Sequence, residues 1–253
     1  MSYGMQGDYQ LPDAVLLKQQ AEWLAPARAR LLRGVGIAHR RRILDLGAGY
    51  GAVTGELARR GGGLVVAVDR EVTAVSTSLR AGIAQISDAP GVCGDARALP
   101  FANESFDLIF CQCVLLWVGD VATPALSGIE VAVREIYRTL QPGGALVALE
   151  PDYGGMMEHP PAIATRDLWL SALQRAGAEP HIGRMLPGLL AKQGFQVQTR
   201  LLDELVPPSP LRFEFLRELP LTEEETAVLH HIEQSTETPQ VVHLPFMLVT
   251  AVR

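Results

Sequence analysis

The chain has 253 residues, of which 48% are hydrophobic and 20% charged, enough for a core that needs no disulfide bond or metal ion. Its net charge of −6 is opposite to the basic balance of proteins that coat nucleic acid, and no segment approaches the ~20 apolar residues of a membrane span. Three cysteines, an odd number, and no apolar leader segment predict a cytoplasmic protein. We expect a monomer or homodimer with no nucleic-acid partner and no membrane insertion.

The first predicted element is an amphipathic helix over Leu11–Leu24, which Pro26 is expected to end. From residue 41 onward, short apolar runs alternate with segments of helical length, a pattern typical of a parallel sheet wrapped by helices. The predicted strands are Ile43–Leu46, Leu64–Val68, Val92–Cys93, Phe106–Cys113, Ala145–Leu149, Phe195–Leu202 and Val241–Val252. The predicted helices between them are Thr54–Arg60, Val72–Ile83 and Leu126–Leu140. These elements predict one α/β domain with a doubly wound sheet.

Two later segments fall outside this alternation. Pro151–Gly194 predicts a loop and two helices, and the glutamate-rich Leu211–Gln234 predicts a solvated helical crossover. Ligands of open α/β sheets bind at the carboxyl ends of the strands. We therefore expect the N-terminal helix and the segment after the fifth strand to cap a pocket there.

A glycine-rich turn follows the first predicted strand. Gly47, Gly49 and Gly51 stand at alternate positions, with Ala48 between the first two, just before a predicted helix. Glycine allows a sharp turn and a close approach of a ligand, and a helix N-terminus offers N–H groups to an anion. The turn suits any nucleotide cofactor, and a loose match to the dinucleotide fingerprint does not choose between them.

Asp45, two residues before Gly47, distinguishes between cofactors. A pyrophosphate beside it would be repelled by about 4 kcal/mol, for unit charges ~4 Å apart at an effective dielectric constant of about 20. A ligand that carries an ammonium and a sulfonium group would be attracted by a similar amount. This charge therefore favours S-adenosylmethionine over NAD.

Asp69 and Asp95 end the second and third predicted strands. Asp69, with Arg70 beside it, is placed to accept hydrogen bonds from ribose hydroxyls, as it would be for NAD. Asp95, followed by Ala96, could accept a hydrogen bond from an adenine amino group, or could form an Asp turn or helix cap. The fourth strand ends at Cys111 and Gln112, whose carbonyl groups could face the amino acid part of the ligand.

Five motifs occur in order along residues 41–150. They are Asp45–Gly51, Val68–Asp69, Gly94–Phe101, Phe106–Ile109 and Arg134–Gly144. This ordered set resembles the class I S-adenosylmethionine-dependent methyltransferases, above all the small-molecule branch that includes ubiquinone and menaquinone biosynthesis methyltransferases. The resemblance implies a Rossmann-like sheet of order 3-2-1-4-5-7-6 with the last strand antiparallel. It also implies that Gly47 and Gly49 line the methionine portion, Asp69 the ribose and Asp95 the adenine.

The acceptor side of the site follows the fifth strand. Methyl transfer needs mainly a nucleophile held in line and water excluded, so we expect no obligatory catalytic triad. Tyr153 could orient or deprotonate an acceptor, and His159 could act as a base unless it is an exposed loop histidine. We expect Trp117, Tyr153 and His181 to contact the substrate, with core packing or a surface turn as alternatives.

The sequence thus predicts a methyltransferase for a small or medium organic acceptor, with the methylated atom (O, N or C) unresolved. We divide its single domain, 1–253, into an N-terminal helical cap (1–40), a cofactor-binding half (41–150) and a substrate-side half (151–253). Helical insertions are expected at 151–194 and 207–239. We predict no metal site, because in the implied strand order Cys93 lies three strands, about 14 Å, from Cys111. The alternatives are an NAD-dependent oxidoreductase, which Asp45 disfavours, and a cofactor-binding but inactive partner subunit.

Overall fold

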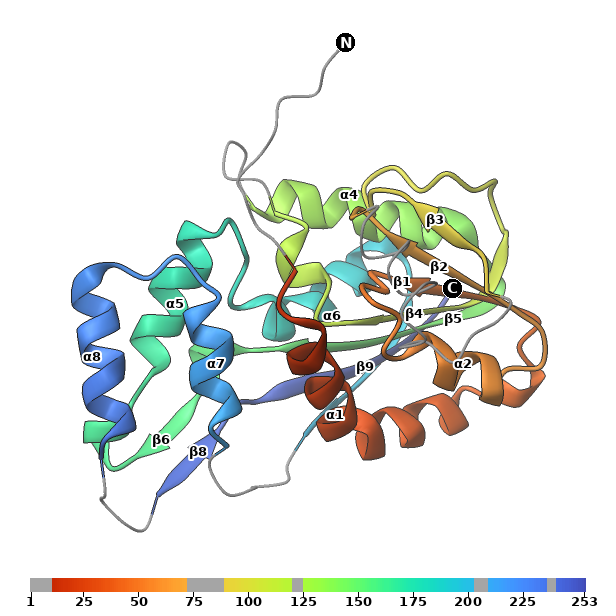
Figure 1. The fold of residues 1–253 in the computed structure, drawn as a ribbon. Helices are drawn as coiled ribbons and strands as arrows, with labels where there is room; N and C mark the ends of the chain where they lie inside the picture. The colour runs from red at the N-terminus through yellow and green to blue at the C-terminus, as the bar shows by residue number, and fades with distance from the viewer. Residues whose placement is uncertain (1–10, 72–88, 120–124, 203–208, 236–239) are drawn as a thin grey trace.

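The computed structural model describes residues 11–71, 89–119, 125–202, 209–235 and 240–253. Its main sheet has seven strands in the order β3-β2-β1-β4-β5-β9-β7 (Figure 1). The strands are β1 (Arg42–Leu46), β2 (Leu64–Asp69), β3 (Gly91–Cys93), β4 (Phe106–Gln112), β5 (Leu140–Pro151), β7 (Gln196–Leu201) and β9 (Phe246–Val252). The first five pair in parallel, and β9 lies antiparallel between β5 and β7. The predicted fold class and strand order are confirmed.

Helices cover both faces of this sheet. They are α1 (Ala14–Gly34), α2 (Thr54–Arg60), α4 (Ala125–Thr139) and α6 (Ile182–Gln193). Successive side chains of a strand point to opposite faces, so each strand contributes to two cores. Leu44 and Leu46 of β1 pack in the core on the α4 and α6 side, whereas Ile43 packs in the core on the α1 and α2 side. Figure 1 shows these two pairs of helices on either side of the strands.

The N-terminal helix is longer than predicted. Asp13 caps α1 by accepting a hydrogen bond from the N–H of Val15 at 2.7 Å. The helix then continues through Pro26 to Gly34, so the predicted stop at Pro26 was wrong. Proline removes one backbone donor, but buried side chains on both sides of it pack on the sheet and outweigh that local cost. These are Leu24, Ala27, Leu31 and Leu32.

The predicted strand Val241–Val252 is interrupted. It forms β8 (Val241–His243) and β9, separated by Leu244 and Pro245. Proline has no N–H to donate to a sheet, so the ladder breaks there. β8 pairs with β6 (Met157–His159), a short strand that the sequence did not predict, in a separate two-stranded sheet.

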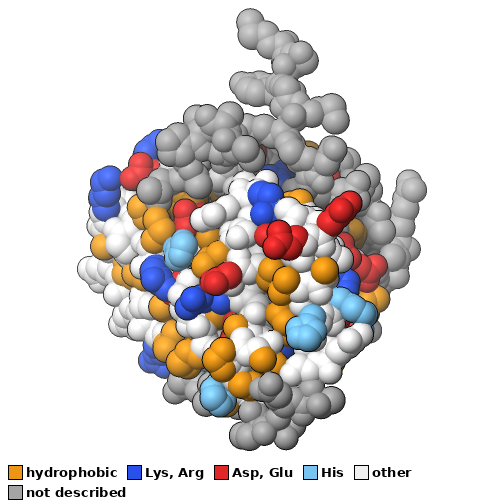
Figure 2. All heavy atoms as spheres, turned by 90° about the vertical axis from the view of Figure 1, so that its left-hand side faces the viewer, with side chains coloured by type: hydrophobic (Ala, Val, Ile, Leu, Met, Phe, Trp, Pro, Cys, Tyr) orange, Lys and Arg blue, Asp and Glu red, His pale blue; other side chains and the backbone are white. Residues whose placement is uncertain are grey.

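The inserted segments form helices beside the carboxyl end of β5. The two helices predicted within Pro151–Gly194 are α5 (Arg166–Arg175) and α6, and the glutamate-rich segment forms α7 (Leu211–Arg217) and α8 (Glu223–Glu233). A capping box between Thr222 and Glu225 starts α8. Figure 1 places α5, α7 and α8 together, and Figure 2 shows mixed hydrophobic, charged and histidine side chains on that face.

The helix predicted over Val72–Ile83 lies outside the described residues. Within the described part of the chain, every helix is too short or too polar to cross a membrane.

Candidate functional site

Two pockets adjoin at the carboxyl ends of the central strands. We call the first the Asp69 pocket, because Asp69 and Asp95 lie in its wall. We call the second the Tyr153 pocket; it lies between the glycine turn and the inserted helices, and Tyr153 is in its wall. The residues that line both pockets are Leu11, Gly47, Cys113 and Trp117. The predicted ligand edge of the sheet therefore carries two connected compartments.

The glycine turn after β1 is held by hydrogen bonds to β2. Gly47 and Ala48 donate their N–H groups to the carbonyl oxygen of Val68, at 2.8 and 3.0 Å. Gly49 donates its N–H to Oδ2 of Asp69 at 2.7 Å. We expected N–H groups of this segment to meet an anionic group, but these three are used within the protein.

Backbone geometry explains why this turn needs glycine. Gly47, Gly49 and Gly51 have φ angles of 69°, 51° and 77°, in the left-handed region that other residues rarely adopt. A Cβ atom on Gly47 would also lie 2.4 Å from a methyl group of Val114. The turn is therefore closed against the segment that follows β4.

Asp45 lies in the wall of the Tyr153 pocket and is only 2% exposed. Its Oδ2 accepts a hydrogen bond from Oγ1 of Thr54 at 2.5 Å. Burial raises the pKa of Asp45 to about 7, against the hydrogen bond from Thr54 and the charge of Arg28, while Asp69 adds to the rise. A cation beside this carboxyl would favour its charged form.

Arg28 of α1 brings a buried positive charge near Asp45, and sequence reasoning missed it. Its Nη2 and Nε donate to Oε2 of Glu56 at 2.6 and 2.8 Å, and its Nη1 donates to Oε1 of Gln112 at 2.9 Å. The guanidinium thus ties α1 to α2 and to the end of β4. The available signal was its position four residues after Leu24, on the same face of the helix.

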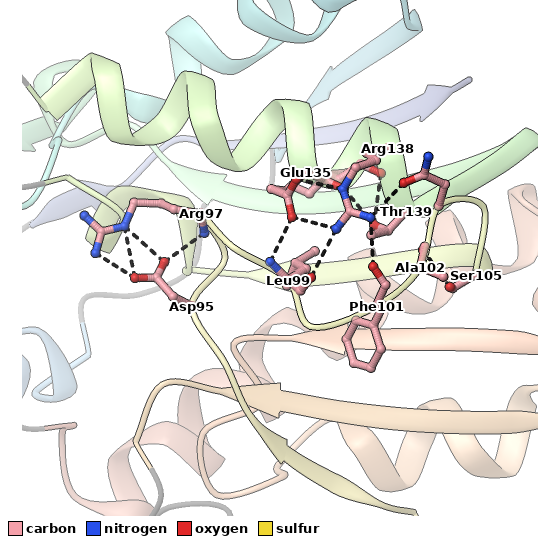
Figure 3. A network of polar contacts seen from close by, with 11 residues as sticks. Asp95, Arg97, Leu99, Phe101, Ala102, Ser105, Glu135, Arg138 and Thr139 are labelled. Carbon is pink, nitrogen blue, oxygen red and sulfur yellow. Dashed lines mark hydrogen bonds and ion pairs between the residues drawn. The ribbon is translucent and has the colours of Figure 1, made fainter. Parts of the chain in front are cut away.

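Asp95 pairs with Arg97 beside the Asp69 pocket (Figure 3). Nη2 of Arg97 lies 2.6 Å from Oδ2 of Asp95, and the backbone N–H of Arg97 donates to Oδ1 at 2.8 Å. Partial burial acts to raise the pKa of Asp95, but these hydrogen bonds and the charges of Arg97 and Arg70 lower it. The hydrogen bond from the N–H of Arg97 to the side chain of Asp95 forms an Asp turn, one of the two roles predicted for Asp95. Asp95 therefore forms that turn and also lines the pocket.

A second ion pair fixes the segment after Arg97 (Figure 3). Glu135 of α4 accepts the N–H of Leu99 at 2.9 Å and pairs with Arg138 at 2.8 Å. Arg138 donates to the carbonyl oxygens of Leu99 and Phe101 at 3.1 and 2.8 Å. The pair anchors to α4 the loop that carries Asp95.

The predicted cofactor residues divide between the pockets. Those in the wall of the Asp69 pocket are Gly47, Asp69, Arg70, Asp95 and Ala96. Those in the wall of the Tyr153 pocket are Asp45, Gly47, Ala48, Gly49 and Gln112. Gly51 and Cys111 line neither, and the fully buried Cys111 packs in the core on the α4 and α6 side.

The predicted acceptor residues are not all brought together. Tyr153 and Trp117 line the Tyr153 pocket, and the ring of Tyr153 stacks on Trp169 of α5 with centroids 4.8 Å apart. His181 lies outside both pockets, with Nδ1 3.2 Å from Oε1 of Glu179. His159 is exposed on β6, also outside both.

The three cysteines do not form a cluster. Cys93 is exposed on β3, whereas Cys111 is buried on β4, three strands away in the sheet. Burial raises the pKa of the Cys113 thiol well above its usual range, so this group stands neutral in the wall of both pockets. Across the described residues, no three His, Cys, Asp or Glu side chains form a group that could hold a metal ion.

A family model and several curated proteins match part of the chain. Residues 44–148 match the model of the methyltransferase domain family. A demethylmenaquinone methyltransferase of Mycolicibacterium paratuberculosis is 36% identical over 148 residues, which are 58% of this chain and 56% of that protein. A malonyl-[acyl-carrier protein] O-methyltransferase of Halorhodospira halophila is 35% identical over 109 residues, 43% of this chain and 34% of that protein. The chain thus spans about a third to just over half of the length of these curated relatives.

A solved structure agrees on the architecture. The YcgJ protein of Bacillus subtilis matches with a TM-score of 0.65 and 17% sequence identity, covering 89% of this chain and 97% of that chain. At this level of identity the likeness concerns the fold alone.

Proposed function

We propose that the chain is a class I S-adenosylmethionine-dependent methyltransferase that acts on a small or medium organic molecule, because residues 44–148 match the methyltransferase domain family and a demethylmenaquinone methyltransferase is 36% identical over 148 residues. The observation that carries this proposal is the pair of adjoining pockets. One has two carboxylates, Asp69 and Asp95, in its wall, and the other contains the buried Asp45. A cofactor and an acceptor bound in adjoining compartments can react across their common boundary.

The carboxyl groups suit S-adenosylmethionine by charge. Asp45 would stand beside the positively charged methionine end, which would favour its ionised form despite burial. Asp69 would accept hydrogen bonds from the ribose, and Asp95 would do so from the adenine. A diphosphate beside Asp45 would meet repulsion instead. We therefore assign the Asp69 pocket to adenosine and the boundary near Gly47 to the methionine end.

When bound, S-adenosylmethionine supplies a methyl group on a positively charged sulfur, which becomes a neutral thioether after an acceptor attacks the methyl carbon. The protein binds both molecules in line and keeps water out. Tyr153, 8% exposed, would orient the acceptor through its hydroxyl group or, as the phenolate, accept its proton. Trp117 lines both pockets and would separate the acceptor from the adenosine.

Thermal-shift and calorimetric titrations with S-adenosylmethionine, its demethylated product S-adenosylhomocysteine and NAD test the cofactor. We expect the first two to bind and raise the melting temperature, and NAD to do neither. Stabilisation by NAD alone would contradict the proposal and favour an oxidoreductase.

Release of S-adenosylhomocysteine in the presence of acceptors then tests turnover. Turnover with the isolated protein supports an autonomous enzyme. Turnover that needs a product of a neighbouring gene would favour the partner-subunit alternative.

A further inference from the structure

The Tyr153 pocket is enclosed mainly by elements outside the sheet. Helix α1 contributes Leu17, Gln20 and Ala21 to its wall. The turn after β4 contributes Leu116 and Trp117. The inserted helices and the segment after β5 contribute Tyr153, Trp169, Leu173, Phe215, Glu218 and Leu219. The acceptor side is thus made by the parts of the chain that are added to the common sheet.

This wall is apolar and aromatic. Six aromatic residues line the pocket, although aromatic residues make up only 6% of the chain. They are Tyr50, Phe110, Trp117, Tyr153, Trp169 and Phe215. Tyr153 and Trp169 are 8% and 6% exposed, and their rings are stacked at 29° to each other, so they hold one another in place. Such a wall favours a molecule with flat apolar surface, because aromatic rings gain from offset or edge contacts with other rings.

The charges of the wall are negative. Asp45 and Glu218 are the charged side chains that line the pocket in the described part of the chain, with no Lys, Arg or His among the lining residues there. The buried guanidinium of Arg28 lies outside the lining and is paired with Glu56.

The segments outside the described residues also contain few positively charged residues. Segments 1–10, 120–124, 203–208 and 236–239 contain no Lys, Arg or His, and 72–88 contains only Arg80. A carboxylate or phosphate on the acceptor would lose water without gaining a counter-charge from the lining residues, a costly transfer.

We infer that the acceptor is an apolar molecule with a planar ring system that carries no negative charge. This inference rests on the proposed function, because the inference takes the Tyr153 pocket as the acceptor compartment of the proposed methyl transfer. Asp45 faces the cofactor in that assignment, so Glu218 at the end of α7 is the acid that meets the acceptor. Because Glu218 is exposed, solvent screens its charge, and its effect on acceptor affinity should be moderate.

Calorimetric titration with two matched probes tests the inference. In the presence of S-adenosylhomocysteine, 2-naphthol and 3-hydroxy-2-naphthoic acid differ by one carboxylate on the same ring system. We expect the uncharged probe to bind at least ~10-fold more tightly at pH 8. Equal or tighter binding of the carboxylate probe would overturn the inference, as would binding of neither.

A charge reversal tests the role of the wall. Glu218→Lys should tighten binding of the carboxylate probe by ~3-fold or more and leave 2-naphthol within about twofold. Glu224→Lys, on the exposed surface of α8 and outside both pockets, is the matched control and should change neither. The same gain in both variants would show that net charge, rather than the pocket wall, governs binding.

The order of titrations separates this inference from the proposed function. Absence of S-adenosylhomocysteine binding would contradict the proposed function itself. Binding of S-adenosylhomocysteine without binding of 2-naphthol would leave methyl transfer standing and overturn only the acceptor class.

Discussion

Glu150, at the carboxyl end of β5, accepts a hydrogen bond from the backbone N–H of Leu115 at 2.9 Å. The same oxygen, Oε1, accepts the N–H of Val114 at 3.0 Å. Glu150 is fully buried, and burial raises its pKa to about 7 against the effect of these backbone bonds. The turn that it holds carries Cys113 and Trp117, which line both pockets. Glu150 thus supports the boundary between the pockets without lining either.

Replacement of Glu150 should test that support. Glu150→Ala leaves two backbone N–H groups without an acceptor, at about 1–3 kcal/mol each, so we expect a loss of about 2–6 kcal/mol in the free energy of unfolding. Glu150→Gln keeps an acceptor oxygen and removes the buried ionisation, and should cost less than about 1 kcal/mol at pH 8. Urea unfolding of both variants measures the difference. An alanine variant as stable as the glutamine variant would show that the hydrogen bonds do not hold the turn.

Asp45 predicts a pH dependence of the ligand-free protein. Its pKa is about 7 in the fold, above the ordinary value of 3.8, so the folded state binds more protons than the unfolded state between these values. Stability should therefore fall as pH rises from about 4 to 7, with the penalty complete above 7. Glu150 acts in the same direction, so Asp45→Asn should reduce this slope without abolishing it. Melting temperatures at pH 5, 6, 7 and 8 measure it, and identical slopes for variant and parent would contradict the assignment.

Much of the fold was predictable because the signals were local. The apolar run Ile43–Leu46 and the glycines after it predict a strand and a turn, and the structure has both. Parallel strands covered on both faces leave a continuous apolar pattern that needs no knowledge of partners. The order of the sheet came instead from the resemblance, because strand patterns alone do not say which strands are neighbours.

The predictions that were wrong or incomplete concern features that depend on tertiary packing. Pro26 has a local tendency to end a helix, but packing of α1 on the sheet outweighs it. The paired position of Arg28 was missed for the same reason, because it lies beyond the predicted end of the helix. Which aromatic side chains line the Tyr153 pocket depends on how α5 and α7 pack beside the carboxyl end of β5, which no local pattern encodes.

Arg28 should be important for stability. Its side chain is 4% exposed and that of Glu56 is 13% exposed, so Arg28→Met leaves a largely buried carboxylate with less compensation. We expect a loss of about 3–5 kcal/mol in the free energy of unfolding, and partial recovery when Glu56→Met is added. Arg30→Met, on the exposed side of α1, is the control and should change stability by less than about 0.5 kcal/mol. Equal effects at 28 and 30 would show that the buried pair is not important.

Asp69 should contribute to cofactor binding through two interactions. Its carboxylate lines the Asp69 pocket and also accepts the N–H of Gly49 at 2.7 Å. Asp69→Ala removes both interactions and should weaken S-adenosylmethionine binding by ~10-fold or more, measured by isothermal titration. Asp69→Asn keeps one acceptor oxygen and should lose less. Unchanged affinity in the alanine variant would contradict the ribose assignment.

Tyr153→Phe should separate binding from turnover. The substitution keeps the ring stacked on Trp169 and removes only the hydroxyl group, so S-adenosylmethionine affinity should stay within about twofold. If the hydroxyl orients or deprotonates the acceptor, kcat should fall by ~10-fold or more. His159→Gln is the comparison, because His159 is exposed on β6 outside both pockets, and we expect it to keep kcat within about twofold. A loss of kcat in the His159 variant with full activity in the Tyr153 variant would reverse the two roles.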